Sequence, residues 1–172
     1  MNIKVFISYH RADSNYRKKA ENILRSHNIE YYAVPENIDF HGQSAESIKT
    51  FLCEKLKQCD VLLCLIGKDT YKRPHVDHEI HTALKGNAGD RLGIVGVHLP
   101  KRKDRLQAID LSTFPAKLWD NKDYVVWSEW SKLNDDILNL IQSAYNRSKD
   151  RTLQTNHSNP CMQLRKTLYY DN

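Results

Sequence analysis

The sequence has no hydrophobic run long enough to cross a membrane. Its longest apolar run covers residues 61–66, whereas a membrane-spanning helix needs about 20 apolar residues. The chain starts Met1-Asn2 and enters an apolar segment at once, without the layout of a signal peptide. These absences predict a cytoplasmic protein without a membrane contact.

Cysteine is scarce, and no two cysteines have the C-x-x-C spacing. The four are Cys53, Cys59, Cys64 and Cys161, and the first three lie in or beside apolar stretches. Thiols in such surroundings are usually small buried hydrophobes in a reducing compartment. The chain has 172 residues, so we expect one domain whose core needs no disulfide or metal.

Glycine-rich phosphate loops are also absent, because neither G-x-G-x-x-G nor a Walker loop occurs. The polar cluster at residues 75–81 resembles a zinc helix, but Thr82 follows His78 by four residues, so the zincin spacing is not met. Asp77 and His81 have a spacing that could share a metal, although an exposed polar helix face is the more common reason for such a pair. We predict no metal.

Strong positive charge is missing from most of the chain. The net charge is +5, and residues 147–172 supply +3 of it through five basic and two acidic residues. The basic run around Arg102 is typical of a solvated loop. So mild an excess argues against nucleic acid as a partner.

Short apolar runs alternate with helical periodicity along the chain. Strands are expected at residues 3–7, 29–34, 61–66, 92–99 and 124–127, and helices beginning near Asp13, Ser44, Pro74 and Leu133. Such alternation implies parallel strands with right-handed crossovers. We predict an α/β, flavodoxin-like doubly wound sheet of about five parallel strands, in the order 2-1-3-4-5 with helices on both faces. It occupies residues 1–146, and residues 147–172 form a polar, basic extension that begins like a linker.

Ligands of such sheets bind beyond the carboxyl ends of the strands, at the switch point between the first and third strands. This directs attention to residues 8–11 and 67–69, the loop at 39–44 and the start of the helix at Pro74. On that helix, Glu79 lies at the edge of the apolar stripe, between Val76 and Ile80. A carboxylate there either reaches out to solvent or is held at the rim of a pocket.

Four ordered motifs resemble those of TIR-like domains. Residues 4–10 resemble the opening strand, residues 34–44 occupy the place of the BB loop, residues 59–66 resemble the third strand, and residues 74–80 fall on the glutamate-bearing helix. The similarity spans residues 1–99. With His10 after the first strand, the chain is most similar to the TIR-like signal-producing component of bacterial Thoeris antiphage systems.

The resemblance implies an enzyme that cleaves NAD+ at the nicotinamide–ribose bond, with NAD+ as substrate, no cofactor and Glu79 as the catalytic carboxylate. One carboxylate suits this reaction, because the leaving nicotinamide needs little acid catalysis and the developing ribosyl cation needs a nearby negative charge. The implied product is an ADP-ribose derivative, linear or cyclic, that diffuses to a separate effector protein. Self-association is also implied, and a phage-derived trigger is left open.

The resemblance also places further side chains at the substrate. They are Ser8, Tyr9 and His10 after the first strand, Asp39 and Phe40 in the loop, Ser44 and His75. The ring of Tyr9 could stack on the dinucleotide, whereas capping of the second helix is the commoner role for Ser44. His75 replaces the Trp of the family, which makes this wall of the pocket smaller and titratable.

Two other functions remain open at this point. Many TIR domains act as scaffolds that associate with their own kind and catalyse nothing, and the change to His75 is compatible with that role. A nucleoside deoxyribosyltransferase-like enzyme would also use a carboxylate on a flavodoxin-like fold. Release of nicotinamide separates the first alternative from an NAD+-cleaving enzyme, and substrate profiling separates the second.

Overall fold

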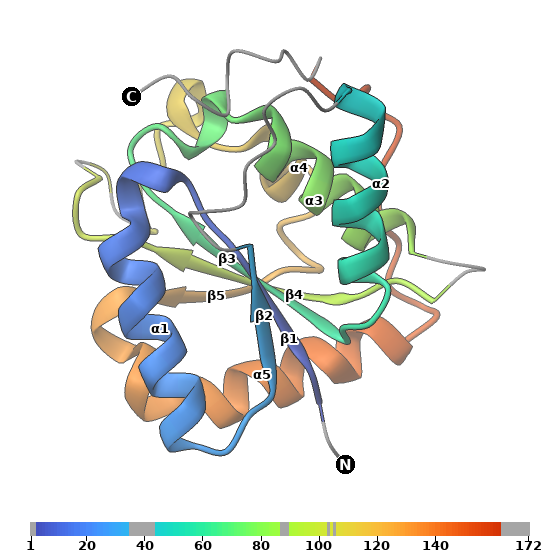
Figure 1. The fold of residues 1–172 in the computed structure, drawn as a ribbon. Coiled ribbons are helices and arrows are strands. Elements are labelled where there is room, and N and C mark those ends of the chain that lie inside the picture. The colour runs from blue at the N-terminus through green and yellow to red at the C-terminus, as the bar shows by residue number, and fades with distance from the viewer. Residues whose placement is uncertain (1–2, 35–43, 87–89, 103, 105, 163–172) are drawn as a thin grey trace.

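A computed structural model of the protein describes residues 3–34, 44–86, 90–102, 104 and 106–162. One parallel sheet has the strand order β2-β1-β3-β4-β5, which confirms the predicted class and order (Figure 1). The strands are β1 (Val5–Ser8), β2 (Tyr31–Ala33), β3 (Val61–Ile66), β4 (Gly93–His98) and β5 (Val126–Glu129). All of their ends lie within two residues of the predicted ones.

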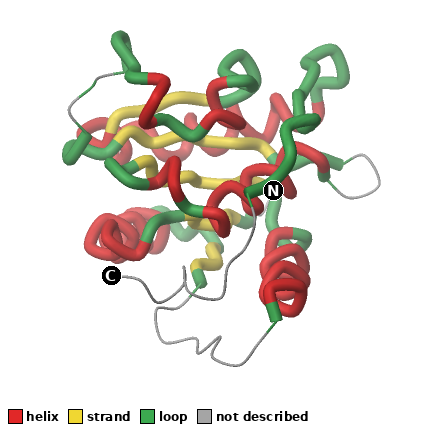
Figure 2. The backbone as a smooth tube through the Cα atoms, turned by 90° about the horizontal axis from the view of Figure 1, so that it is seen from above, coloured by secondary structure: helices red, strands yellow, loops and turns green. Residues whose placement is uncertain are grey.

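Helices cover both faces of the sheet, as Figure 2 shows from above. They are α1 (Ser14–Ser26), α2 (Ala45–Leu56), α3 (Pro74–Lys85), the short α4 (Ala116–Trp119) and α5 (Leu133–Lys149). Helices α1 and α5 pack on one face, which we call the α5 face. Helices α2, α3 and α4 lie on the other, the α3 face.

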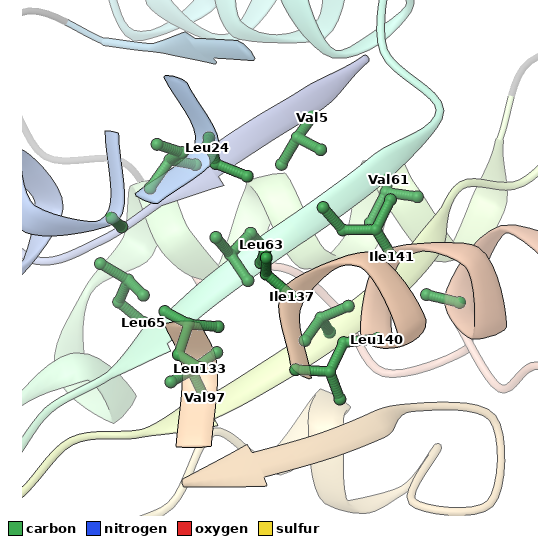
Figure 3. Close-up of a cluster of buried hydrophobic side chains, with 14 of the residues drawn as sticks. Val5, Leu24, Val61, Leu63, Leu65, Val97, Leu133, Ile137, Leu140 and Ile141 are labelled. Carbon is green, nitrogen blue, oxygen red and sulfur yellow. The ribbon is translucent and has the colours of Figure 1, made fainter. Parts of the chain in front are cut away.

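Strand β3 is buried along its whole length because both of its faces are covered. Leu63 and Leu65 pack on the α5 face, where Ile137 and Ile141 of α5 meet them (Figure 3). Cys64 alternates with them and belongs to the core of the α3 face. A continuous apolar run therefore fills two cores at once.

Strand β5 begins two residues later than predicted. Tyr124 and Val125 still belong to the turn between α4 and β5, because both of their amides donate to Asn121 O. Tyr124 is 1% exposed, and its hydroxyl donates to Leu92 O at 2.6 Å. These two residues are apolar because they fill the core, not because they extend the strand.

The residues predicted to begin the helices differ in whether they cap the helix N-terminus. Ser44 caps α2, since its Oγ accepts a hydrogen bond from Ser47 N at 3.0 Å, and Pro74 opens the first turn of α3. Asp13 occupies the cap position of α1, but its side chain makes no capping bond and instead packs against Gly67. A Cβ at Gly67 would lie 2.0 Å from Asp13 Oδ2, so any other residue where β3 ends would displace the Asp13 side chain.

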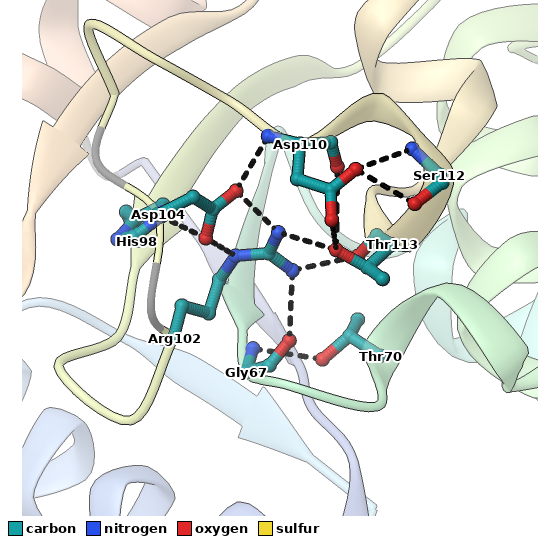
Figure 4. Close-up of polar contacts among 8 residues, drawn as sticks. All are labelled: Gly67, Thr70, His98, Arg102, Asp104, Asp110, Ser112 and Thr113. Atoms are coloured by element: carbon teal, nitrogen blue, oxygen red, sulfur yellow. Dashed lines mark hydrogen bonds and ion pairs between the residues drawn. The ribbon is translucent and has the colours of Figure 1, made fainter.

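The basic run after β4 does not form a fully solvated loop, so that prediction was wrong for Arg102. Its side chain is buried, and the guanidinium donates to Asp104, to Gly67 O at 3.3 Å and to Thr113 O at 2.7 Å (Figure 4). Lys101 is exposed as expected. Arg102 therefore ties the segments that follow β3 and β4 to each other.

Candidate active site

A buried hydrogen bond joins the end of β1 to α3. Ser8 Oγ donates to Glu79 Oε2, across 71 residues of sequence. Ser8 is 1% exposed and Glu79 is 3% exposed. Ser8 points toward α3 because side chains alternate along a strand, and its neighbour Ile7 packs on the α5 face. The pair lies at the carboxyl edge of β1, where the fold predicts a ligand site.

Burial raises the pKa of Glu79 to about 8, although the hydrogen bond from Ser8 works in the opposite direction. Without a ligand, the carboxyl group is therefore mainly protonated at neutral pH. A cation brought beside it would favour the ionised form. The site can thus respond to a positively charged ligand by releasing a proton.

The thiol of Cys64, which the sequence indicated only as a small buried hydrophobe, lies next to the Ser8–Glu79 pair. Cys64 on β3 is the register partner of Ser8 on β1 and is fully buried. Burial, and then the nearby carboxylate of Glu79, raise the pKa of Cys64, while a hydrogen bond with Ser8 lowers it. Cys64 therefore stays a neutral thiol that packs beneath the two polar side chains.

The raised pKa of Glu79 predicts a specific pH dependence of stability. The folded-state pKa of about 8 lies above the unfolded value of 4.5, so the folded protein holds the proton more tightly between these pH values. This contribution to stability is complete below pH 4.5 and is lost as the pH rises through 8. In urea unfolding, wild type should lose roughly 3–5 kcal/mol relative to Glu79→Gln across this window. Parallel pH profiles of the two proteins would contradict the prediction.

Two histidines lie close to each other at the carboxyl edge of β1. His75, one turn before Glu79 on α3, places Nε2 at 3.3 Å from Tyr9 O, so this nitrogen carries the hydrogen. Burial lowers the pKa of His75 to about 4, and nearby His10 and Arg73 contribute. Burial also lowers the pKa of His10 to about 4, followed by the charge of Arg73. Both imidazoles are therefore neutral at pH 7.

Polar atoms without partners mark the surroundings of these histidines. His10 is 7% exposed, yet its Nδ1 is buried without a hydrogen-bond partner, as is Nε of Arg73. Arg73 stands immediately before α3, at the positive end of the helix dipole. Sequence reasoning missed Arg73; its position just before Pro74 is the signal that could have indicated it. Buried polar groups of this kind normally need a ligand or water.

Of the predicted substrate-binding residues, Ser8 contacts Glu79 directly, and His10 lies near His75, one turn before Glu79 on α3. Tyr9 points to the α5 face, where its hydroxyl donates to Val34 O at 2.9 Å and Arg17 lies 5.5 Å from the ring centre. Ser44 is exposed and engaged in its cap. Asp39 and Phe40 lie outside the described residues, so their contact with a ligand stays a prediction.

Asp77 forms an ion pair with Lys117 at 2.6 Å rather than sharing a metal with His81. Among the described residues, no group of three or more His, Cys, Asp or Glu side chains could hold a metal ion. Nor does any helix in this part of the chain have the length and apolar character needed to cross a membrane.

A family model of the Thoeris protein ThsB, TIR-like domain, matches residues 6–104. The TIR domains in the structure of the activated Roq1 resistosome, which directly recognizes the pathogen effector XopQ, align at a TM-score of 0.47 and 16% identity, over 86% of this chain and 84% of that chain. A putative quinone reductase from Klebsiella pneumoniae aligns at 0.41 and 12%, over 89% and 86%. No curated protein matches this chain. The family match includes Ser8, His10, Arg73, His75 and Glu79.

Proposed function

Because the chain belongs to the TIR-like domain family of the Thoeris protein ThsB, we propose that it cleaves NAD+ and that an ADP-ribose-derived product carries a signal in antiphage defence. The observation that supports this most directly is the buried Ser8–Glu79 pair at the carboxyl edge of the sheet. Burying a carboxyl group costs folding free energy, and such groups are found preferentially at functional sites.

In this reaction the bond between ribose C1′ and the nicotinamide nitrogen breaks, and its electron pair leaves with nicotinamide. The cationic ring of NAD+ favours the ionised form of Glu79 as it enters, and the carboxylate then stabilises the developing ribosyl cation. Ser8 orients the carboxylate through its hydrogen bond. With water as acceptor, the products are nicotinamide, ADP-ribose and one proton; capture by an atom of the same nucleotide gives a cyclic product and one proton.

The unpartnered groups of His10 and Arg73, which lie near His75, suit the rest of the dinucleotide. Arg73 Nε at the start of α3 can donate to a phosphate oxygen, with the helix N-terminus supporting the negative charge. His10 Nδ1 can bond a ribose hydroxyl. The neutral ring of His75, held by Tyr9 O, can form a wall against the nicotinamide. In this arrangement Ser8, His10, Arg73 and His75 bind, and Glu79 is the catalytic residue.

The remaining parts of the proposal concern partners. The product would diffuse to a signal-responsive effector protein, and activity would require self-association and a trigger from the infecting phage. We place these events in the cytoplasm. There the four cysteines, all free thiols in the structure, would stay reduced.

The test is to incubate concentrated protein with NAD+, with and without lysate from phage-infected cells, and to follow nicotinamide by mass spectrometry. We expect nicotinamide together with a second product whose mass identifies the signal as linear or cyclic. Folded, self-associated protein that releases none in either condition would contradict the proposal and favour a scaffold. Parallel assays with deoxynucleosides and free bases would reveal a deoxyribosyltransferase.

A further inference from the structure

Residues 150–162 follow α5 as an extended segment, which we call the strap. It contains no helix or strand, and most of its residues are exposed. Figure 1 shows it in red, leaving the end of α5 on the side of the sheet that carries α2 and α3. Its composition is typical of a linker, yet its main chain is bound at several points by side chains of the α3 face.

The first attachment lies between the strap and the segment before β4. Arg91 donates to Leu153 O at 2.6 Å and to Asp150 O. The guanidinium of Arg91 lies 4.8 Å from the ring centre of Tyr124, and the Leu153 side chain packs against the core of the α3 face. Leu153 is the strap's apolar anchor in that core.

The second attachment is a reciprocal pair between a side chain and the main chain. Asn121, which follows α4 and is 4% exposed, donates through Nδ2 to Asn156 O at 2.8 Å. Asn156 N donates back to Asn121 Oδ1 at 2.6 Å. A buried amide side chain that bonds both main-chain groups of one residue holds an extended segment without depending on that residue's side chain.

The third attachment joins the strap to the helix that carries Glu79. Lys117 of α4, 4% exposed, donates to Asp77 Oδ1 at 2.6 Å and to Pro160 O at 3.1 Å. Asp77 Oδ2 accepts from Met162 N at 2.9 Å, and His78 Nε2 lies 3.0 Å from Met162 O. A buried ion pair is stable only if its other hydrogen bonds are made, and here the strap makes them.

Helix α3 is therefore held from both sides. Glu79 and Ile80 face the sheet, whereas Asp77 and His78, in the same helical turn, bond the strap. We propose that the strap is a releasable clamp on α3, and that its attachment keeps Glu79 in reach of Ser8 and so controls the activity of the site. The part that concerns activity rests on the proposed function.

Release of the strap breaks mainly polar contacts, because the strap is attached mainly by polar groups. Water can replace main-chain and side-chain hydrogen bonds, whereas a packed core element must expose apolar surface to open. With Leu153 as its anchor in the core, the strap belongs to the low-stability parts of the fold. Partial detachment would leave the sheet intact and free the outer side of α3.

The test uses the full chain with Leu153→Gln, which weakens the apolar anchor. The matched control is Leu138→Gln, the same change at a side chain of α5 that is 56% exposed; Leu153→Met is the conservative rescue. Hydrogen exchange read by mass spectrometry should become about tenfold faster in residues 74–85 and in the strap, and stay unchanged in residues 61–66. Leu138→Gln and Leu153→Met should exchange like wild type.

Nicotinamide release provides the second reading. Leu153→Gln should lower kcat at least about tenfold, with KM within about twofold of wild type, because a displaced carboxylate weakens the transition state more than binding. Faster exchange of the strap without faster exchange of α3 would overturn the clamp. Faster exchange of α3 with full activity would overturn its control of the site. If wild type cleaves no NAD+, the proposed function fails. The exchange experiment still shows whether the strap holds α3, so the two failures can be told apart.

Discussion

Glu79→Gln should reduce nicotinamide release at least about a hundredfold, the usual cost of removing a group that stabilises transition-state charge. The fold should survive, because the amide has nearly the same shape and its oxygen can still accept the hydrogen bond that Ser8 donates to Glu79. The variant should also be more stable than wild type at pH 8, since it carries no ionisable group in this buried position. Lost activity together with raised stability identifies a functional residue.

The matched control is Glu54→Gln, the same change at an exposed residue of α2, which should release nicotinamide like wild type. For wild type, kcat/KM should rise with pH and level off above about 8, because it reports the pKa of the free enzyme and the carboxylate is the active form. Release by Glu79→Gln at the wild-type rate would remove Glu79 from the mechanism.

Arg102→Met should cause a large loss of stability, on the order of 3 kcal/mol. The substitution removes the partner of Asp104, whose side chain is 10% exposed, and leaves Gly67 O and Thr113 O without their donor. Burial acts to raise the pKa of Asp104, but the hydrogen bonds from Arg102 and from Asp110 N outweigh it and hold the pKa at about 2. Without Arg102 that carboxylate loses its charged partner and keeps the hydrogen bond from Asp110 N, with His98 Nε2 at 3.3 Å.

Urea unfolding measures this effect. Lys101→Met is the matched control, because Lys101 is the exposed neighbour in the same basic run, and it should change stability by less than about 0.5 kcal/mol. The double variant Arg102→Met with Asp104→Asn should recover part of the loss, since the unpaired charge is gone. Equal stability of Arg102→Met and Lys101→Met would show that the network in Figure 4 contributes nothing.

The strands could be predicted because their signals are local, and their order followed from the fold type that the strand–helix alternation indicates. A continuous apolar run such as residues 61–66, ended by Gly67, indicates a covered central strand whatever lies around it. The start of β5 could not be predicted, since Tyr124 and Val125 have the composition of a strand but pack as a buried turn. Periodicity records which side chains are buried and not which main-chain groups pair.

The resemblance to TIR-like domains indicated Glu79, whose catalytic role stays a prediction, but the contacts of this residue could not be predicted from the sequence. Glu79 stands out at the edge of an apolar stripe, but its partner Ser8 lies 71 residues away and no local pattern connects them. Tyr9 follows Ser8 directly and therefore points to the opposite face of the sheet. Arg102 belongs to a run of basic residues, and its burial depends on the carbonyls of Gly67, which follows β3, and of Thr113.

The covering of the sheet by α5 has a consequence for how the chain is made. The apolar side chains that β1 and β3 direct to the α5 face meet their partners on α5 only after residues 133–149 have been synthesised. At about 5–20 residues per second, the ribosome needs roughly 4–17 s to pass from the end of β3 to the end of α5. During that time the part of the α5 face that α5 covers stays open, which gives chaperones a defined period and a defined surface on which to act.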